Sequence, residues 1–112
     1  MICDHWDVVS VPFPFVERPA AKRRPALVIS TKEFNKENDH SVLAMITTAM
    51  LDRWPSDYLL ARYLEAGLKH SSYVRWKVFT LPNIIIVKKV GELADEDREE
   101  IIKKARTIFI RP

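Results

Sequence analysis

The spacing of apolar residues changes once along this chain, and that change constrains the fold more than any other feature. Short β-branched and apolar runs come first and recur as far as residue 88, and such runs are typical of strands. Near the carboxyl end, Ile101, Ala105 and Ile108 follow the spacing i, i+4, i+7, which predicts an amphipathic helix. Strands followed by one terminal helix predict a mainly β domain with some α structure, in the form of a small barrel with helices added.

The predicted strands differ in how fully they should be buried. Residues 25–30 and 41–48 are almost continuously apolar, which is typical of strands covered on both faces. Pro12 and Pro14 cannot donate to a sheet, so pairing of the first strand should fade there or lie at an edge. The predicted strands span residues 7–11, 25–30, 41–48, 72–76 and 84–88.

The segments between these strands are more polar. Residues 31–40 predict a loop with a helical turn near residues 32–36, whereas residues 50–67 fit no single element. In the terminal helix, Asp95 is the expected N-cap, acidic residues fill the first turn and basic residues lie near the end, as the helix dipole favours.

Composition excludes several classes of function. The chain of 112 residues has the length of one domain, which we assign to residues 1–112. Its only glycines are Gly67 and Gly91, so it has no glycine-rich loop for a nucleotide or dinucleotide cofactor. A single cysteine, Cys3, forms neither an internal disulfide nor a thiolate zinc cage.

The location and the metal content follow from similar arguments. No apolar run approaches the roughly 18 residues of a membrane helix, and the amino terminus lacks the pattern of a secretory signal. We therefore expect a cytoplasmic protein that does not enter a membrane. The three histidines, at positions 5, 40 and 70, are too scattered for a metal motif, so neither a metal nor a cofactor is expected.

Positive charge is concentrated in the first third of the chain. The net charge is only +3, but residues 17–36 hold six basic and two acidic residues. Within them, Lys22, Arg23 and Arg24 directly precede Pro25, and the proline restricts Arg24 to an extended backbone. An arginine held in this way offers a planar fork suited to a phosphate. A solvated charge cluster at the entrance to a strand is the alternative.

Other polar residues lie in or beside predicted strands. Thr47 and Thr48 end an apolar strand, where their hydroxyls bind a phosphate oxygen or satisfy the backbone. Arg75 lies beside Trp76, and its side chain suits a phosphate, a base or a nearby aromatic ring. Trp6, Trp54 and Trp76 either pack in the core or stack on single-stranded bases.

Several ordered segments resemble the PemK/MazF-like toxins of bacterial type II toxin–antitoxin systems. The likeness runs from about Asp7 to Phe109, and its specificity lies in the ordered set rather than in one motif. The segments are DVVSVPFPF from Asp7, KRRPALVIS from Lys22, LAMIT from Leu43, EAGL from Glu65, SYVR from Ser72, FTL from Phe79 and VGEL from Val90.

The resemblance implies an SH3-like barrel of the CcdB/MazF/PemK type with a carboxy-terminal helix, assembled as a homodimer. It implies metal-independent cleavage of single-stranded RNA, often mRNA, by attack of the RNA's own 2′-OH, and inhibition by a cognate acidic antitoxin. Arg24 and Thr47 match the family's residues at the scissile phosphate. The candidate RNA-binding residues are Glu17, Lys22, Arg23, Thr48, Arg75 and Lys77.

The chain departs from the family pattern at three places. Trp6 stands where a glycine usually precedes the first aspartate, and Lys77 stands where some relatives have an acid. No histidine follows the first strand, where Glu17 is the nearby carboxylate. Two alternatives remain open: a non-catalytic CcdB-like toxin that binds a protein target, and an inactive nucleic-acid-binding barrel.

Overall fold

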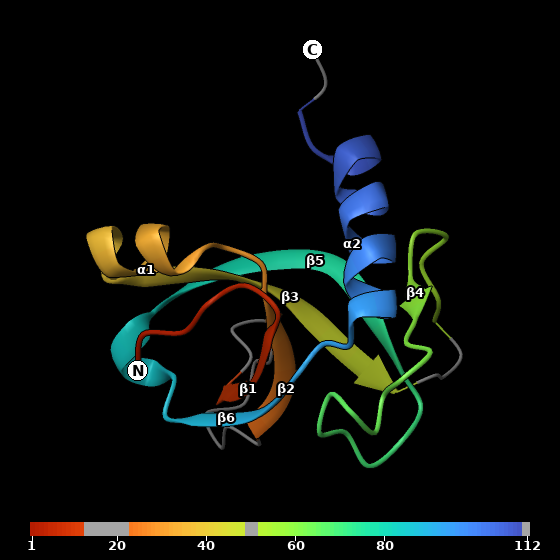
Figure 1. Ribbon diagram of the computed structural model, residues 1–112, viewed down its shortest axis with the longest axis horizontal. Coiled ribbons are helices and arrows are strands. Elements are labelled where there is room, and N and C mark those ends of the chain that lie inside the picture. The colour runs from red at the N-terminus through yellow and green to blue at the C-terminus, as the bar shows by residue number, and fades with distance from the viewer. Residues whose placement is uncertain (13–22, 49–51, 111–112) are drawn as a thin grey trace.

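Six strands and two α-helices make up the computed structural model, which describes residues 1–12, 23–48 and 52–110 (Figure 1). None of the helices in these segments is long and apolar enough to cross a membrane. The elements are β1 (Asp7–Pro12), β2 (Arg23–Val28), α1 (Lys32–Asn38), β3 (His40–Thr48), β4 (Tyr58–Leu59), β5 (Ser72–Pro82), the 3-10 helix η1 (Asn83–Ile85), β6 (Lys88–Glu92) and α2 (Asp95–Ile108).

The strands form one curved sheet in which every neighbouring pair is antiparallel. Their order is β4-β5-β3-β2-β1-β6, so β1 lies between its sequence neighbour β2 and the last strand of the chain. In Figure 1 the sheet curls round on itself, and α2 stands beside it near the opposite end of the molecule from α1. This is the small barrel with a terminal helix that the sequence predicts.

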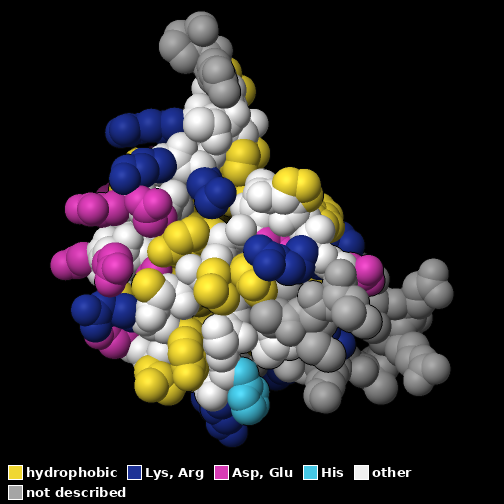
Figure 2. All heavy atoms as spheres, turned by 90° about the vertical axis from the view of Figure 1, so that its right-hand side faces the viewer, with side chains coloured by type: hydrophobic (Ala, Val, Ile, Leu, Met, Phe, Trp, Pro, Cys, Tyr) yellow, Lys and Arg dark blue, Asp and Glu magenta, His cyan; other side chains and the backbone are white. Residues whose placement is uncertain are grey.

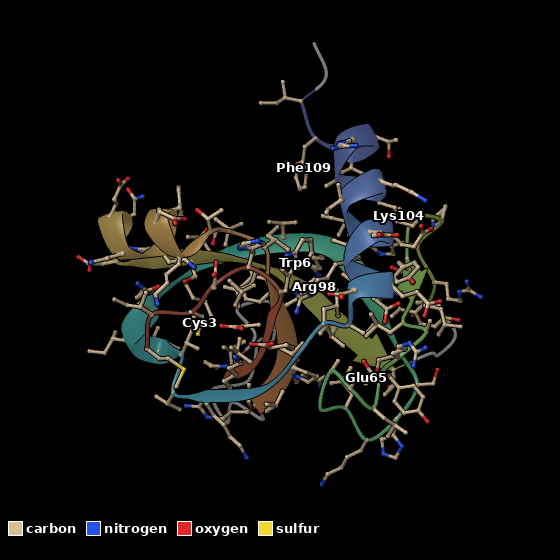
Figure 3. The ribbon with its side chains drawn as sticks, in the orientation of Figure 1. Cys3, Trp6, Glu65, Arg98, Lys104 and Phe109 are labelled. Atoms are coloured by element: carbon tan, nitrogen blue, oxygen red, sulfur yellow. The ribbon has the colours of Figure 1, made fainter. Side chains whose placement is uncertain are left out.

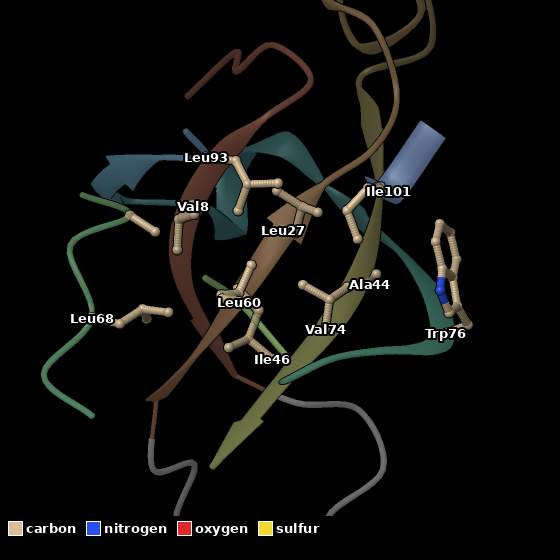
Figure 4. Close-up of a cluster of buried hydrophobic side chains, with 11 residues drawn as sticks. Val8, Leu27, Ala44, Ile46, Leu60, Leu68, Val74, Trp76, Leu93 and Ile101 are labelled. Atoms are coloured by element: carbon tan, nitrogen blue, oxygen red, sulfur yellow. The ribbon is translucent and has the colours of Figure 1, made fainter. Parts of the chain in front are cut away.

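Buried side chains form two separate clusters, one on each face of the sheet. Val8 and Leu27 belong to the first cluster, and the adjacent Val9 and Val28 belong to the second. Because successive side chains in a strand point to opposite faces, the apolar runs reflect burial on both sides. The first cluster, drawn in Figure 4, comprises Val8, Leu27, Ala44, Ile46, Leu60, Ala66, Leu68, Val74, Trp76, Leu93 and Ile101.

The two glycines of the chain meet at one place. A Cβ on Gly67 would lie 2.0 Å from the carbonyl oxygen of Val90, and one on Gly91 would lie 2.4 Å from that of Ala66. Gly67 also has a φ of 81°, a conformation that side chains disfavour. The turn before β5 and strand β6 therefore pack backbone against backbone, and no larger residue fits at either position.

A buried carboxylate, Asp97, fastens the start of α2 to the segment after β4. It accepts hydrogen bonds from the Tyr58 hydroxyl at 2.5 Å and from the backbone N–H groups of Ala61 at 2.9 Å and Arg62 at 3.0 Å. Burial and the neighbouring Asp97 raise the pKa of Tyr58 above its ordinary value. The helix cap is Ala94 rather than the expected Asp95, and its side chain makes no capping hydrogen bond.

The isoleucine run near residue 85 is not the predicted strand. Residues 83–85 form η1, and the strand begins only at Lys88. The buried Asn83 redirects the chain: its amide donates to the Asn35 carbonyl at 2.7 Å and its side-chain oxygen accepts from Ser41 at 2.6 Å. Ile86 is fully buried, whereas Ile84 is 83% exposed. The isoleucine run therefore adds Ile86 to the core and leaves Ile84 at the surface.

Candidate active site

The ends of β2 and β3 bring together Arg24 and Thr47, the two residues that the family resemblance implies at the scissile phosphate. The strands pair with Ala26 opposite Met45, and the same register extended by two residues sets Arg24 level with Thr47. Pro25, which lies between Arg24 and Ala26, has no N–H with which to extend the pairing. A pocket of about 300 Å³ lies at this point, lined by Arg24, Pro25, Ile46, Thr47, Thr48 and Ser72.

Arg24 gives this pocket its positive charge. Its backbone pairs with Val11 of β1, and the following proline keeps it extended, so the strand fixes where the side chain starts. The residue is exposed, which leaves the pocket accessible from solvent. Of the described residues that line the pocket, Arg24 alone has an ionisable side chain. One arginine and two threonines therefore line the same pocket.

The hydroxyl groups of the pocket differ in how firmly they are engaged. Thr47 Oγ1 donates to the carbonyl of Thr48 at 3.4 Å, which is long for a hydroxyl hydrogen bond. Ser72, by contrast, is buried and donates to the carbonyl of His70 at 2.8 Å. Compared with Ser72, Thr47 can therefore more readily exchange its partner for a phosphate oxygen.

Among the described residues, no other basic residue of the first third lines this pocket. Arg23 is exposed, and its guanidinium donates to the carbonyl of Ser10 in β1 at 3.0 Å. Its side chain leaves the sheet on the face opposite to that of Arg24, because successive residues of a strand alternate. Lys22 and Glu17, two other candidate RNA-binding residues, lie outside the described residues.

Arg75 is engaged with a buried acid rather than directed into the pocket. Its Nε and Nη2 donate to Asp57 at 3.1 and 2.8 Å, and the Asp57 side chain is 0% exposed. Although burial alone would raise the pKa of Asp57, hydrogen bonds from Arg75 and from the Trp54 N–H hold it below its usual value. The hydrogen bonds to Asp57 also raise the pKa of Arg75. The structure therefore ties Arg75 to the segment that precedes β4.

Lys77 lies in an irregular part of β5. The pairing with β3 shifts between Ala44, which faces Val78, and Met45, which faces Arg75. Trp76 and Lys77 are therefore the extra residues of a β-bulge, a feature that redirects side chains. Lys77 is half-buried and does not line the pocket.

A second hollow, which we call the α2 groove, lies between α2 and the sheet. Its volume is about 440 Å³, and Arg106 is its one charged lining residue among those described. The indole N–H of Trp76 is buried there without a hydrogen-bond partner among the described residues. Figure 3 shows Trp6 and Phe109 on the side of α2 that borders this groove. The lining comprises Trp6, Ile29, Trp76, Ile101, Ile102, Ala105, Arg106, Phe109 and Ile110.

Trp6 contributes to this groove from an unusual backbone conformation. Its φ is 78°, the left-handed region that glycine adopts most easily. Its N–H donates to the carbonyl of Val28 at 2.9 Å, and its own carbonyl accepts from Leu93 at 2.9 Å. The tryptophan thus keeps the backbone shape that a glycine would favour and adds a large apolar ring to the groove.

Two parts of these sites were not predicted from the sequence. Ser72 opens a predicted strand, but only the pairing of Thr48 with Ser72 places it in the pocket. The Asp57–Arg75 pair joins residues 18 positions apart, and no local spacing indicates it. No cluster of three or more metal-binding side chains occurs among the described residues.

Comparison with known proteins identifies the group to which the chain belongs. The family model of the PemK-like, MazF-like toxins of type II toxin–antitoxin systems matches residues 4–109. The chain is a member of this family. The toxin family predicted from the ordered segments is therefore confirmed. No curated protein matches the toxin in a direct search.

Solved structures place the fold in the same group. The MazE–MazF complex of Deinococcus radiodurans gives a TM-score of 0.74 at 18% identity and covers 96% of each chain. An endoribonuclease in complex with its cognate antitoxin from a mycobacterial species gives 0.70 at 14% identity, covering 95% of this chain and 91% of the other. The toxin MazF-mt6 of Mycobacterium tuberculosis gives 0.71 at 16% identity, with 90% and 93% covered. The predicted fold is confirmed.

Proposed function

We propose that this toxin is an endoribonuclease that cleaves single-stranded RNA without a metal ion. The observation that carries the proposal is the presence of Arg24 and Thr47 in one solvent-accessible pocket. A cationic fork beside a hydroxyl suits a phosphodiester, because both groups donate hydrogen bonds to negatively charged oxygens. The family and the endoribonuclease among the similar structures support the same reading.

In the proposed reaction the RNA supplies its own nucleophile. The 2′-oxygen attacks the adjacent phosphorus, the bond to the 5′-oxygen breaks, and the products are a 2′,3′-cyclic phosphate and a 5′-OH. The proton of the 2′-OH leaves as the new bond forms, and the departing 5′-oxygen gains a proton. Negative charge grows on the non-bridging oxygens, where preorganised donors lower the barrier most.

We assign Arg24 and Thr47 to the stabilisation of this charge rather than to proton removal. An arginine stays protonated at neutral pH and so has no lone pair to accept a proton. Its two parallel N–H groups match two phosphate oxygens. Thr47, level with Arg24 on the next strand, donates to an oxygen from the other side of the pocket.

We also propose two protein partners, and cytoplasmic action on RNA. An acidic antitoxin would bind the region of residues 17–36, where basic residues outnumber acidic ones by six to two. A second copy of the toxin would cover the α2 groove, since exposed apolar patches mark interaction sites.

The test is cleavage of a long unstructured RNA by the purified toxin in the presence of EDTA. Fragments that end in 2′,3′-cyclic phosphate and begin with 5′-OH would support the proposal. RNA that stays intact would contradict it. Intact RNA that is nevertheless bound would point to the inactive nucleic-acid-binding barrel instead.

A further inference from the structure

Beside the pocket, the segment of residues 52–57 holds a tryptophan on the surface in a fixed position. Trp54 is 40% exposed, whereas most of the large apolar side chains in the described sheet are buried. Two reciprocal hydrogen bonds close the turn: the Trp54 N–H donates to the Asp57 carboxylate and the Asp57 N–H donates to the Trp54 carbonyl, both at 3.0 Å. The turn therefore fixes the backbone from which the indole projects.

Arg75 holds this turn against β5. Besides its two bonds to Asp57, it donates to the carbonyl of Asp52 at 2.5 Å. Its guanidinium carbon lies 5.4 Å from the centre of the Trp54 ring, within the range of a cation–π contact. Because only 15% of the Arg75 side chain is exposed, it acts as a fixed support behind the turn.

The turn adjoins the pocket through β5. Tyr73 pairs with Thr47. The guanidinium carbon of Arg53 lies over the Tyr73 ring, 4.7 Å from the ring centre. Arg53 directly precedes Trp54 in the sequence. A cation and an exposed aromatic ring therefore follow one another in the sequence, and the cation packs on the residue of β5 that pairs with Thr47.

From this arrangement we propose that Trp54 is a base-stacking platform that binds one nucleotide of the RNA near the scissile phosphate. Arg53 would contact the backbone of that strand, and Arg75 is a positioning residue that orients the platform. Stacking on an exposed aromatic ring is the usual way in which proteins hold unpaired bases, and a ring already fixed in place loses little entropy on binding. The inference rests on the proposed function, because it takes RNA as the ligand of the pocket.

The experiment measures binding of an RNA that carries a 2′-O-methyl group at the cleavage position and so cannot react. Trp54→Ala should weaken binding about tenfold or more, and Trp54→Phe should retain most of the affinity. Leu64→Ala is the matched control, because Leu64 is also apolar and 71% exposed but belongs neither to residues 52–57 nor to the lining of the pocket. This control should bind as the unaltered toxin does.

An abasic scan identifies the stacked nucleotide. In this scan, one base at a time is removed from the same RNA, and binding to the unaltered toxin is measured. Loss of the stacked base should weaken binding by the same factor as Trp54→Ala does, and loss of any other base should weaken it less. The same abasic RNA should lose nothing further with Trp54→Ala, because coupled partners are not additive. Arg75→Gln should lose affinity by a similar factor, and the Arg75→Gln, Trp54→Ala double variant should add little to that loss.

Two results would overturn the platform. Equal RNA affinity of Trp54→Ala and the unaltered toxin would do so directly. Weaker binding of an acidic antitoxin peptide to Trp54→Ala, with RNA affinity unchanged, would assign the surface to protein instead. Cleavage of unmodified RNA by the unaltered toxin is scored separately, so a toxin that binds through Trp54 but cuts nothing contradicts only the proposed function.

Discussion

The pocket that Arg24 and Thr47 line and the α2 groove differ in size and are opposite in chemistry. The pocket, of about 300 Å³, joins an arginine to threonine hydroxyls, whereas the groove, of about 440 Å³, is lined mainly by aromatic and aliphatic side chains. Volume alone would point to the groove as the substrate site. The positions of the donors point to the pocket, because a phosphodiester requires fixed positive charge and N–H or O–H groups.

The α2 helix illustrates why the groove suits a protein partner. Acidic residues occupy its first turn and a basic residue its last, and in Figure 2 the acidic side chains lie in a band below basic ones. Mixed charge of this kind does not attract RNA, but it can surround an apolar contact in the way that a polar rim surrounds a protein interface. The proposed roles therefore divide between two hollows, with RNA chemistry in the pocket and the subunit contact at the α2 groove.

The strongest test of this division is Arg24→Ala. Loss of one preorganised donor should lower the single-turnover cleavage rate by about 10²–10³-fold while the fold is retained, because Arg24 is exposed. Arg24→Lys should restore little, since a point charge does not reproduce a fork. A rate near that of the unaltered toxin for Arg24→Ala would remove the pocket as the active site.

Thr47→Val tests the hydroxyl without changing the shape of the pocket. We expect the cleavage rate to fall by about 10–100-fold, the loss typical of a hydrogen bond to a charged group. Thr80→Val is the control, because Thr80 is exposed on β5 opposite Val42 and is not part of the pocket. An equal loss in both variants, measured in single-turnover assays, would show that the effect is not specific to the pocket.

Ile102→Glu tests the groove. Ile102 is 38% exposed, and a carboxylate there would be buried by a second copy, so dimerisation should weaken by at least about tenfold. Light scattering should then report a mass near 13.1 kDa at concentrations where the unaltered toxin gives twice that value. Ile84→Glu, at a residue 83% exposed outside the groove, should stay dimeric. A dimeric Ile102→Glu variant would assign the groove to another role.

Arg23→Ala should have the smallest effect. With its side chain on the other face of β2, Arg23 is expected to contact RNA phosphate away from the reaction, so affinity falls a few-fold and the cleavage rate at saturation does not change. The slope of log affinity against log salt should decrease by about 0.7, as for one phosphate contact on a single strand. A loss of rate as large as that of Arg24→Ala would place both arginines in the chemistry.

The sequence predicted the parts of this molecule that depend on local pattern. The apolar runs around Val28 and Leu43 identified two strands buried on both faces, and the proline after Arg24 indicated an extended arginine at a strand end. The resemblance then linked Arg24 with Thr47, and the register of β2 and β3 sets them level.

What the sequence did not predict depends on contacts between distant residues. The run around Ile85 is as apolar as a strand, but the amide of Asn83 bonds to Asn35 and Ser41 and bends the chain. From the sequence, Arg75 suited a phosphate, a base or an aromatic ring, and only the fold brings the buried Asp57 to it. The spacing of apolar residues does not predict which distant polar side chains form a hydrogen bond, because tertiary structure determines these contacts.

The position of β1 between β2 and β6 has a consequence for how the toxin is made. Val8 pairs with Gly91, 83 positions later, so β1 keeps one unpaired edge until nearly the whole chain has been synthesised. At translation rates of about 5–20 residues per second, that interval lasts on the order of 4–17 s. The hairpin-like pairing of β2 with β3 needs no such wait, because both strands leave the ribosome early. The pocket strands can therefore pair while the barrel is still open, and the nascent chain is most exposed to aggregation at β1 until β6 arrives.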